Sequence, residues 1–413
     1  MAELASDAAL SEEARLAHDF RLTRVPDDFI DDPYRYYALL RRHDPVHELE
    51  SGAVLLTRYE DVVSVYRDPR ASSDKKAEFG PKYGDSPLYQ HHTTSLVFND
   101  PPLHTRVRRL IMGALNQRAI MRMEADVSAL VDRLLDRVSG GPEFDLIDEF
   151  AALIPVEVIG NLLDVPRSDR GPLRGWSVAI LSGLEPRLTP AMHEAGNRAV
   201  AEFLAYLEML VAERRKKPGD YESDVLTRLI QGEKDGERLT EKELLHQCIF
   251  LLNAGHETTT NLIGNGLWLL LTRPDELARL RSDPALVPSA VEEMLRYEGP
   301  IQLNNRRVSA PLELGGKSLP AGTFVTIGIG AANRDPAQFP DPERFDVARK
   351  PNRHLAFGQG EHACAGMNVA RMEGRIAFAR LLARFSEIEL TGDPVRDRRI
   401  RFRGFSRLPV RVN

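Results

Sequence analysis

The clearest candidate for chemistry is a lone cysteine, Cys364, in the segment Phe357-Gly358-Gln359-Gly360-Glu361-His362-Ala363-Cys364-Ala365-Gly366. Glycines stand on both sides of the cysteine, and a helical pattern begins directly behind it. Backbone amides at a helix start, together with the helix dipole, lower the pKa of a thiol and so favour the thiolate. Glycines also let a flat, bulky ligand approach the backbone closely. The segment is therefore suited to a thiolate that binds the fifth position of a haem iron.

Three other interpretations of this segment remain open. A loose dinucleotide fingerprint, Gly-x-Gly-x-x-Ala, starts at Gly358, although no βαβ pattern surrounds it. His354, His362 and Cys364 offer zinc ligands, but few further ligands lie nearby in the sequence. An ordinary buried thiol is the third alternative. The glycines and the helix start favour haem over all three.

A second group of reactive side chains interrupts a long apolar helix. Thr240 and Glu243 form a capping-box signature, and the helical pattern runs from there to Thr272. At ~1.5 Å per residue this helix is about 50 Å long, enough to cross a domain. Its middle carries Ala254-Gly255-His256-Glu257-Thr258-Thr259. A threonine inside a helix often only bonds back to the preceding turn, and this interpretation stands beside a catalytic one.

Together these segments resemble the cytochrome P450 monooxygenases, and in particular their soluble bacterial members. The cysteine segment resembles the haem-binding loop of that family, Phe-x-x-Gly-x-(His or Arg)-x-Cys-x-Gly, and residues 254–258 resemble its Ala-Gly-x-(Asp/Glu)-Thr motif. The resemblance extends from Asp100 to the carboxyl terminus. It implies a mainly α, cytochrome P450-like fold, with one triangular helical domain, small β-sheets and a long central helix. It also implies haem b (iron protoporphyrin IX) as the cofactor and Cys364 as the axial ligand of its iron.

The resemblance assigns roles to further residues. Thr258 is expected to hydrogen-bond dioxygen, and Glu257 to relay protons from solvent as a general acid. Buried haem propionates need charged or hydrogen-bonding partners. The residues expected to hold the cofactor beside Cys364 are His104, Arg108, Arg306, His362, Phe357, Gly358, Gly366 and Ala254.

Glu293 and Arg296 form a candidate structural pair. They are three residues apart and so share one helix face, where a surface ion pair is the ordinary outcome. The pair also resembles the Glu-x-x-Arg of the family, which holds the irregular segment before the cysteine loop. We expect Arg344, in the segment Phe339–Phe345, to be the third member, with Arg349 as its competitor.

A substrate pocket is expected on the face of the long helix that turns toward the haem. Helical spacing from Thr258 back through Ala254 to Phe250 defines that face, with Asn253 beside it. The resemblance adds walls from other segments. The complete expected pocket consists of Val97, Leu184, Phe250, Asn253, Ala254, Ile301, Gln302, Asn304 and Phe405. This mixture suits a small, largely apolar substrate, such as an aromatic or terpenoid-like molecule, held by a few polar anchors.

Composition limits the class of protein. Among 413 residues, 42% are apolar and 28% are charged, so the chain can bury a large core. Lys plus Arg number 55 against 61 Asp plus Glu, and the formal charge of −6 argues against a general nucleic-acid binder. Two cysteines exclude a disulfide framework and a four-thiolate zinc site. The chain starts without a signal-peptide pattern and holds no run of ~18 apolar residues, which predicts a cytoplasmic protein without a membrane span.

The remaining patterns predict the elements that position these residues. We expect residues 1–30 to be a mobile lead-in and residues 31–413 to be a single haem domain. A capping-box signature, Ser289 with Glu292, is expected to open a short helix. Other expected elements are a strand at 54–58, a helix at 59–67, a long functional loop at 72–98, strands at 312–314 and 323–329, and an amphipathic helix after Cys364.

The chain ends at Asn413, which leaves no room for a reductase domain. We therefore expect electrons from a separate ferredoxin or flavodoxin with its reductase, docking near Arg106, Arg109 and Arg371. The first hypothesis is a dioxygen-dependent monooxygenase of a small molecule. A peroxide-driven peroxygenase is less favoured because Glu257-Thr258 is intact. A non-catalytic haem-thiolate sensor is the other alternative, and it would not need a proton-delivering threonine.

Overall fold

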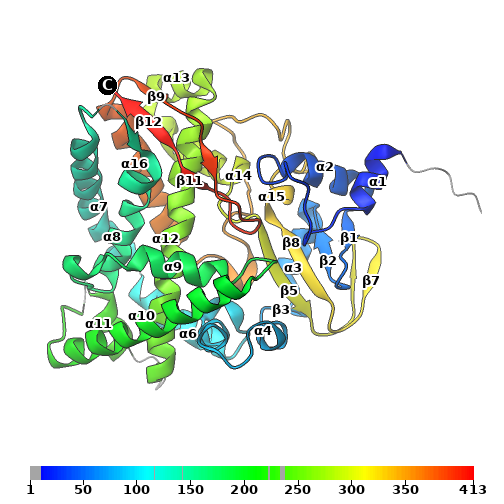
Figure 1. The fold of residues 1–413 in the computed structure, drawn as a ribbon, viewed down its shortest axis with the longest axis horizontal. Coiled ribbons are helices and arrows are strands. Elements are labelled where there is room, and N and C mark those ends of the chain that lie inside the picture. Colours follow the sequence, from blue (N-terminus) through cyan, green and yellow to red (C-terminus); the bar gives the residue numbers. More distant parts are fainter. Residues whose placement is uncertain (1–10, 116, 142, 222–223, 233–237) are drawn as a thin grey trace, which may run out of the picture.

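The computed structural model describes residues 11–115, 117–141, 143–221, 224–232 and 238–413. Figure 1 shows helices gathered on one side of the molecule and a smaller region of strands on the other. The predicted mainly α, cytochrome P450-like fold is confirmed. In the part of the chain that the structure describes, no helix combines the length and apolarity that crossing a membrane requires.

The helices are as follows. The first half of the chain forms α1 (Glu12–His18), α2 (Tyr34–His43), α3 (Tyr59–Arg67), α4 (Lys76–Tyr83), α5 (Pro87–Thr94), η1 (Leu96–Phe98), α6 (Leu103–Ala114), α7 (Gln117–Val138), η2 (Ile147–Ala151), α8 (Leu153–Leu162), η3 (Arg167–Asp169), α9 (Leu173–Ser182) and α10 (Pro190–Lys216). The second half forms α11 (Val225–Gln231), α12 (Glu241–Leu271), α13 (Pro274–Ser282), η4 (Pro284–Leu286), α14 (Val287–Tyr297), α15 (Ile329–Ala332), η5 (Gly360–His362) and α16 (Met367–Arg384).

Within the described residues, the strands form four small sheets. The largest has the order β1 (Val46–Glu48), β2 (Val54–Leu56), β8 (Phe324–Gly328), β5 (Leu303–Val308) and β3 (Ala71–Ser72), with β2 and β8 parallel and the other pairs antiparallel. A three-stranded sheet joins β4 (Phe144–Asp145), β12 (Pro409–Val412) and β9 (Ile388–Leu390). Two hairpin-like pairs are β6 (Leu312–Leu314) with β7 (Lys317–Leu319) and β10 (Val395–Arg396) with β11 (Phe405–Arg407).

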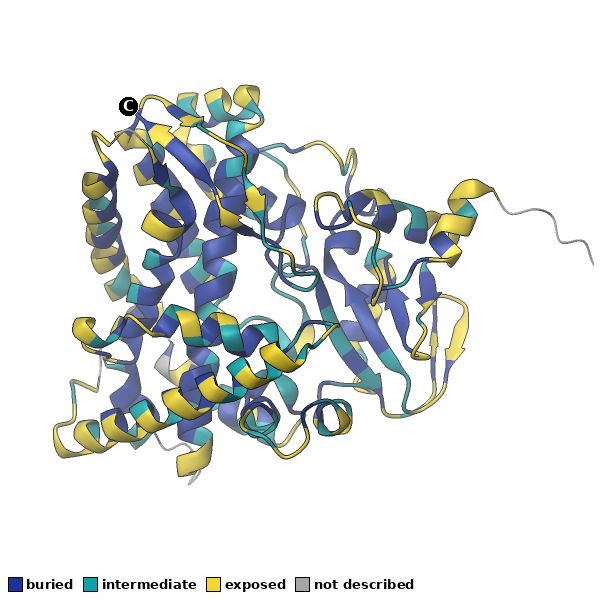
Figure 2. Cartoon of the chain, in the orientation of Figure 1, coloured by how far each residue is buried: buried dark blue, intermediate teal, exposed yellow. Residues whose placement is uncertain are grey.

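The long central helix α12 confirms the expectation drawn from its capping box. The Thr240 hydroxyl accepts the amide of Glu243 at 3.2 Å, and the Glu243 carboxylate accepts the amide of Thr240 at 2.9 Å. Figure 2 shows that α12 is buried along much of its length while the outer helices carry exposed faces. A helix that is apolar on nearly all sides belongs in the core of a domain. The polar residues within α12 therefore require a specific explanation.

Three parts of the chain differ from the sequence-based expectation. The lead-in prediction for residues 1–30 is wrong from residue 11 onward, because Ala17, Phe20 and Phe29 are buried in a cluster with Tyr37. Burial of such side chains contributes roughly 1.5–3 kcal/mol each. Residues 1–10 lie outside the described residues.

The predicted loop at 72–98 instead contains α4, α5 and η1. Pro87 occupies the first turn of α5, where a backbone N–H has no partner within the helix, so the missing N–H of proline costs nothing. The Ser86 hydroxyl accepts a hydrogen bond from the amide of Tyr89 at 3.3 Å. The capping box predicted at Ser289 is also wrong. Helix α14 already begins at Val287, and the Ser289 hydroxyl donates to the backbone carbonyls of Leu286 and Val347.

Candidate active site

A cavity of about 300 Å³ lies between the middle of α12 and the cysteine loop. Its walls come from α5, η1, α12, the start of β5, the segment 356–366 and the carboxyl-terminal segment near Phe402. These elements are far apart in the sequence, so the fold alone brings them together. The cavity contains most of the residues that the sequence predicts for the site.

Cys364 lines this cavity immediately before α16. Its amide donates to the carbonyl of Phe357 at 2.8 Å, which closes the loop onto itself. Burial raises the pKa of the Cys364 thiol, opposed by the amide of Gly366 and the charges of Arg108 and Arg371. The prediction of a lowered thiol pKa is therefore wrong for the chain alone, because desolvation outweighs the helix start and the nearby cations.

The glycines of the cysteine loop have a conformational reason. Gly358 and Gly360 have φ values of +63° and +72°, in the left-handed region that favours glycine. A Cβ at Gly360 would also collide with the backbone carbonyl of Tyr66. Nothing lies within 4 Å of the position that a Cβ at Gly366 would take. The loop therefore approaches α3 closely on one side and leaves open space at Gly366.

Two imidazoles and two guanidinium groups lie beside the cysteine loop. The rings of His104, on α6, and His362 have centroids 3.9 Å apart. Both ring nitrogens of His104 are buried without a hydrogen-bond partner. Arg108 donates to the carbonyl of Ala363 at 2.7 Å. Burial, reinforced by Arg306 and the other members, lowers the pKa of His362 to about 3, so this group is dominated by positive potential.

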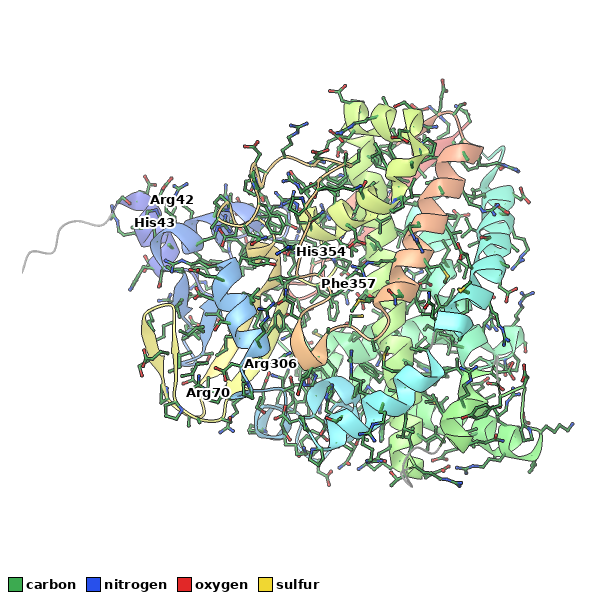
Figure 3. The ribbon with its side chains drawn as sticks, turned by 180° about the vertical axis from the view of Figure 1, so that it is seen from behind. Arg42, His43, Arg70, Arg306, His354 and Phe357 are labelled. Atoms are coloured by element: carbon green, nitrogen blue, oxygen red, sulfur yellow. The ribbon has the colours of Figure 1, made fainter. Side chains whose placement is uncertain are left out.

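Arg306 reaches the same cluster from β5, where it pairs with Val325 across the sheet. Its guanidinium is 5.4 Å from the ring centroid of Tyr66 and donates to the carbonyl of Asn305 at 2.8 Å. Figure 3 shows Arg306 on the sheet side and Phe357 on the loop that leads to α16. His104, Arg108 and His362 line the cavity, whereas Arg306 does not. Orphaned buried imidazole nitrogens beside two guanidiniums fit the two carboxylates of haem.

The face of α12 that turns toward Cys364 carries Ala254 and Thr258, and both line the cavity. Ala254 is exposed there although it lies in the middle of a buried helix. The Thr258 hydroxyl donates to the carbonyl of Ala254 at 2.9 Å. The interpretation that this threonine bonds back to the preceding turn therefore describes the structure, and the hydroxyl also faces the space where a ligand of the cysteine would lie.

Glu257 does not line the cavity. Successive residues of a helix point about 100° apart, so Glu257 faces away from the Thr258 side. It is 3% exposed and pairs with Arg399, whose Nε donates to Asp397 at 2.7 Å. Oε2 of Glu257 has no hydrogen-bond partner. Burial raises the pKa of Asp397 to about 6, so this buried ion cluster contains a group that titrates near neutral pH.

Seven of the nine expected pocket residues line the cavity: Val97, Leu184, Phe250, Asn253, Ala254, Ile301 and Asn304. Gln302 does not, because neighbouring residues of an extended segment point to opposite sides. Its side-chain amide donates to the carbonyl of Gly299 at 2.8 Å. The expectation that Phe405 lines the cavity is also wrong. Its ring packs against Trp268 and the guanidinium of Arg396, and Phe402 lines the cavity in its place.

Several cavity residues are missing from the prediction, among them His91, His92, Glu373 and Arg401. Glu373, on α16, is 3% exposed, and the Thr259 hydroxyl donates to it at 3.3 Å. Burial raises the pKa of Glu373 to about 8. The carboxylate falls on the apolar face of α16 nine residues after Cys364, and this interruption is a signal that the sequence contains. The histidines lie in the segment taken for a loop.

The Glu293–Arg296 pair is fully buried on α14. Two hydrogen bonds of 2.7 and 2.8 Å join the guanidinium to the carboxylate. The third member is Arg349, whose Nε donates to Glu293 at 3.0 Å, and the expectation of Arg344 is wrong. Arg344 contributes only its backbone carbonyl, which accepts from both arginines. The irregular segment before the cysteine loop is thus tied to α14 by side chain and backbone together.

The alternative sites find no support in this geometry. His354 accepts or donates a hydrogen bond with Glu292 at 3.0 Å. Among the described residues, no three His, Cys, Asp or Glu side chains group in a way that could hold a metal ion. The glycines at 358 and 360 follow an irregular segment rather than a strand, so they do not belong to a βαβ unit. The zinc and dinucleotide interpretations are therefore wrong.

All three arginines expected to meet an electron donor are engaged within the chain. Arg106 pairs with Glu243 in the capping box of α12. Arg371 makes hydrogen bonds of 2.7 and 2.8 Å with Glu292. Arg109 has a partner as well. The carboxylates of Glu243 and Glu292 partly neutralise Arg106 and Arg371, which weakens the prediction that these arginines form the docking surface.

A cysteine loop that faces a threonine of a long central helix, with basic groups for two carboxylates, defines a haem-thiolate oxygenase. Comparisons with known proteins agree, since the family model "Cytochrome P450" matches residues 181–412. Cytochrome P450 107B1 of Saccharopolyspora erythraea is 40% identical, covering 94% of this chain and 97% of that protein. The chain belongs to the cytochrome P450 family; it is a monooxygenase and its cofactor is haem b.

Other relatives support the same assignment. The 6-deoxyerythronolide B hydroxylase of Saccharopolyspora erythraea is 38% identical, covering 95% of this chain and all of that protein. Among solved structures, P450BioI in complex with an acyl carrier protein ligated to hexadec-9Z-enoic acid has a TM-score of 0.89 and 33% identity, covering 94% of this chain and 100% of the other. CalO2 has a TM-score of 0.88 and 31% identity, covering 94% and 98%.

Proposed function

We propose that this monooxygenase hydroxylates or dealkylates a small, largely apolar substrate with dioxygen and two electrons from a separate ferredoxin or flavodoxin and its reductase. One observation carries the proposal: Cys364 and Thr258 line the same cavity from opposing elements, and apolar side chains continue that cavity beyond them. The space next to the cysteine is thus continuous with a chamber that could hold a carbon skeleton. Relatives named as hydroxylases of 6-deoxyerythronolide B and vitamin D(3) support carbon hydroxylation as the reaction.

The residues that would hold the haem are those described at the cysteine loop. Cys364 would be the axial ligand, and metal ligation deprotonates a thiol outright even where burial raises its pKa. His104, Arg108, Arg306 and His362 would bind the propionates. Ala254, Phe357, Gly358 and Gly366 would lie against the two faces of the ring. When bound, haem supplies the one-electron and dioxygen chemistry, and a thiolate ligand favours O–O cleavage.

Thr258 and Glu257 would deliver protons to the cavity. The Thr258 hydroxyl, now donating to the Ala254 carbonyl, can turn so that it donates into the cavity instead. Glu257 lies one residue away but pairs with Arg399, which also pairs with Asp397. We infer that proton delivery requires the Glu257 carboxylate to leave Arg399, with its unpartnered Oε2 as the atom that first receives a proton.

The experiment begins with the holoprotein and its ferrous carbon monoxide complex, whose absorption at long wavelength reports thiolate ligation. Cys364→Ala should abolish this band and lower the haem content at least tenfold. The reason is that no second described cysteine reaches the cavity, since Cys248 is buried elsewhere on α12. A band that survives the substitution would refute the ligand assignment.

The same preparation separates the three functional hypotheses. Substrate turnover is compared between a ferredoxin with its reductase and hydrogen peroxide, at equal enzyme. We expect turnover with the protein electron donor. Turnover with peroxide alone would instead support a peroxygenase. A protein that forms the carbon monoxide band but turns over with neither source would be a sensor.

We further propose that residues 11–413 form one haem domain. The amino-terminal cluster contains Leu55 of β2, Leu303 of β5 and Ala331 of α15 together with Tyr37 and Leu40 of α2. It therefore shares its core with the sheet that carries Arg306. Deletion of residues 11–30 should lower both stability and haem content.

A further inference from the structure

Three buried histidines and an asparagine cluster at the end of the cavity that lies toward α5. His91 and His92 belong to α5, whereas His246 and Asn253 belong to α12. Each is at most 4% exposed. The ring of His91 has its centroid 5.1 Å from that of His92 and 5.6 Å from that of His246, and Asn253 Nδ2 is 3.3 Å from His91 Nε2. His91, His92 and Asn253 line the cavity, so we call these three residues its polar end.

The polar end carries hydrogen-bonding atoms that the protein leaves unused. Nδ1 of His91, both ring nitrogens of His92 and Oδ1 of Asn253 have no hydrogen-bond partner. A buried polar atom without a hydrogen-bond partner destabilises the folded protein. These four atoms belong to three residues that line the cavity, and a ligand that reaches them would satisfy them.

The imidazoles of this cluster are uncharged near neutral pH. Burial lowers the pKa of His92 to about 3 and that of His246 to about 4, and it lowers that of His91 well below the ordinary value. The charges of Lys82 and Arg401 act in the same direction on His92. An uncharged imidazole offers one N–H donor and one acceptor nitrogen. The polar end therefore matches a group that both donates and accepts, or one that accepts only.

The neighbouring cations are already engaged. Arg401 also lines the cavity, but its Nε donates to the Leu184 carbonyl at 2.9 Å and its Nη2 to Asn305 Oδ1 at 2.7 Å. Lys82 donates to the carbonyl of Glu185 at 3.0 Å. Each of these three donors already has an acceptor, which is a backbone carbonyl for two of them and the Asn305 side chain for the third. The arrangement therefore favours an uncharged oxygen over an anion.

We propose that His91, His92 and Asn253 bind an uncharged hydroxyl or carbonyl group of an otherwise apolar substrate. This inference rests on the proposed function, since it names the substrate class of the same site. Asn253 is five residues before Thr258, which places the two on the order of 7–8 Å apart along α12. A substrate held by its oxygen thus presents to Thr258 a carbon several bonds away. The enzyme oxidises interior carbons and leaves the anchored end untouched.

The orientation of His92 is fixed independently of a ligand. Its ring lies 5.4 to 5.5 Å from the rings of Phe79, Tyr83 and Phe98, measured between centroids. A ring packed in this way cannot easily turn toward water or toward a new protein partner. The binding group is therefore preorganised, which lowers the entropy cost of binding.

The test uses the holoenzyme and three probes that share a ten-carbon chain: decan-1-ol, n-decane and decanoate. Binding is followed by the shift of the haem Soret band, and the oxidised position by mass spectrometry. We expect decan-1-ol to bind about tenfold more tightly than n-decane, since roughly 1.4 kcal/mol corresponds to tenfold. Products of decan-1-ol should carry the new oxygen at interior carbons. Decanoate should bind more weakly than the alcohol.

His92→Leu and Asn253→Leu should each remove most of the preference for the alcohol and spread oxidation along its chain. Phe250→Leu is the matched control, because it alters an apolar wall of the same cavity and should weaken the alcohol and the alkane alike. Haem content and thermal midpoint are measured for every variant. Since the His92 nitrogens have no partners to lose, His92→Leu should fold at least as well as the wild type.

Equal binding of decan-1-ol and n-decane would overturn the inference, as would a preference for the alcohol that survives both leucine substitutions. Tighter binding of decanoate than of the alcohol would overturn it in favour of an anion site. The proposed function fails differently. If n-decane and decan-1-ol are oxidised equally, the anchor is refuted and the monooxygenase proposal stands. If the binding preference exists but no electron source gives product, the monooxygenase proposal is refuted and the anchor stands.

Discussion

Replacing Arg349 or Arg344 by alanine tests which of these two arginines, five residues apart in the same irregular segment, stabilises the Glu293–Arg296 pair. Arg349 donates from Nε to the buried carboxylate of Glu293 and also to three backbone carbonyls, all between 2.8 and 3.1 Å. A hydrogen bond to a charged group contributes about 1.5–3 kcal/mol. Because Glu293 keeps Arg296 as a partner, the expected loss for Arg349→Ala is roughly 2–3 kcal/mol.

Arg344 is the matched control. Its side chain is exposed and only its carbonyl is used, which alanine retains, so Arg344→Ala should change the free energy of unfolding by no more than ~0.5 kcal/mol. Glu293→Ala should cause the largest loss of unfolding free energy, about 3–5 kcal/mol, because it leaves two buried guanidiniums without their carboxylate.

Urea unfolding of the holoproteins, followed by far-UV circular dichroism, measures all three losses. Haem content is recorded in parallel, because the segment held by Arg349 leads into the cysteine loop. We expect the order Glu293→Ala, then Arg349→Ala, then Arg344→Ala. If Arg344→Ala is as destabilising as Arg349→Ala, the assignment of the third member is refuted.

Three further predictions follow from the cavity. Thr258→Ala should lower hydroxylation by on the order of 10²-fold while hydrogen peroxide rises, measured as product and peroxide per NADPH consumed; unchanged coupling would exclude a role in protonation. The raised pKa of Glu373, about 8, means that the folded state keeps a proton that the unfolded state loses above its ordinary pKa near 4.5. Stability should therefore fall as pH rises between these values, and Glu373→Gln should flatten this slope in urea titrations; an unchanged slope would contradict the raised pKa. Gly360→Ala should reduce haem content and the thermal midpoint, because its Cβ meets the Tyr66 carbonyl at a φ of +72°, whereas Gly80→Ala, with open space around it, should alter neither.

The long helix and the cysteine loop could be predicted because their signals are local. A capping box requires only four consecutive residues, and Thr240 with Glu243 forms both of its hydrogen bonds. Cys364 is followed at once by α16, as its sequence indicates. Local chemistry also places Ala254 and Thr258 on one face, since residues four apart on a helix are about 40° apart.

The sequence-based predictions that are wrong concern features that depend on tertiary structure. Helix α5 is short and contains two adjacent histidines in place of an apolar period. It is stabilised by burial of the His91 ring against α12 and of the His92 ring against α4 and η1. Without a partner the same segment has no reason to be helical. The choice between Arg344 and Arg349 depends on an irregular backbone that includes Asp341 at a φ of +47°. No period relates such a segment to α14, so sequence spacing cannot decide which arginine reaches Glu293.

Glu257 and Asn253 show why polar residues within a buried helix must be interpreted by their partners. They are four residues apart on α12, about 40° apart around the helix, but only Asn253 lines the cavity. Beside Glu257, the carboxyl-terminal segment of the same chain supplies a cation, Arg399, and the two side chains form an ion pair. At the level of Asn253, a residue that lines the cavity, the neighbour is the uncharged His91, and the amide oxygen has no hydrogen-bond partner.

The same criterion applies at the opposite end of the cavity, where both nitrogens of His104 are unused beside Arg108. There the neighbouring charges are positive, so the missing partner is an anion, and the haem propionates are such anions. At the polar end two uncharged imidazoles and the Asn253 amide offer both donors and acceptors, so we infer that the missing partner is an uncharged oxygen. The two ends of one cavity thus differ in what accompanies the unpartnered nitrogens, arginines at one end and an amide at the other. This difference orients an amphipathic substrate with its oxygen toward α5 and its carbon chain toward Cys364.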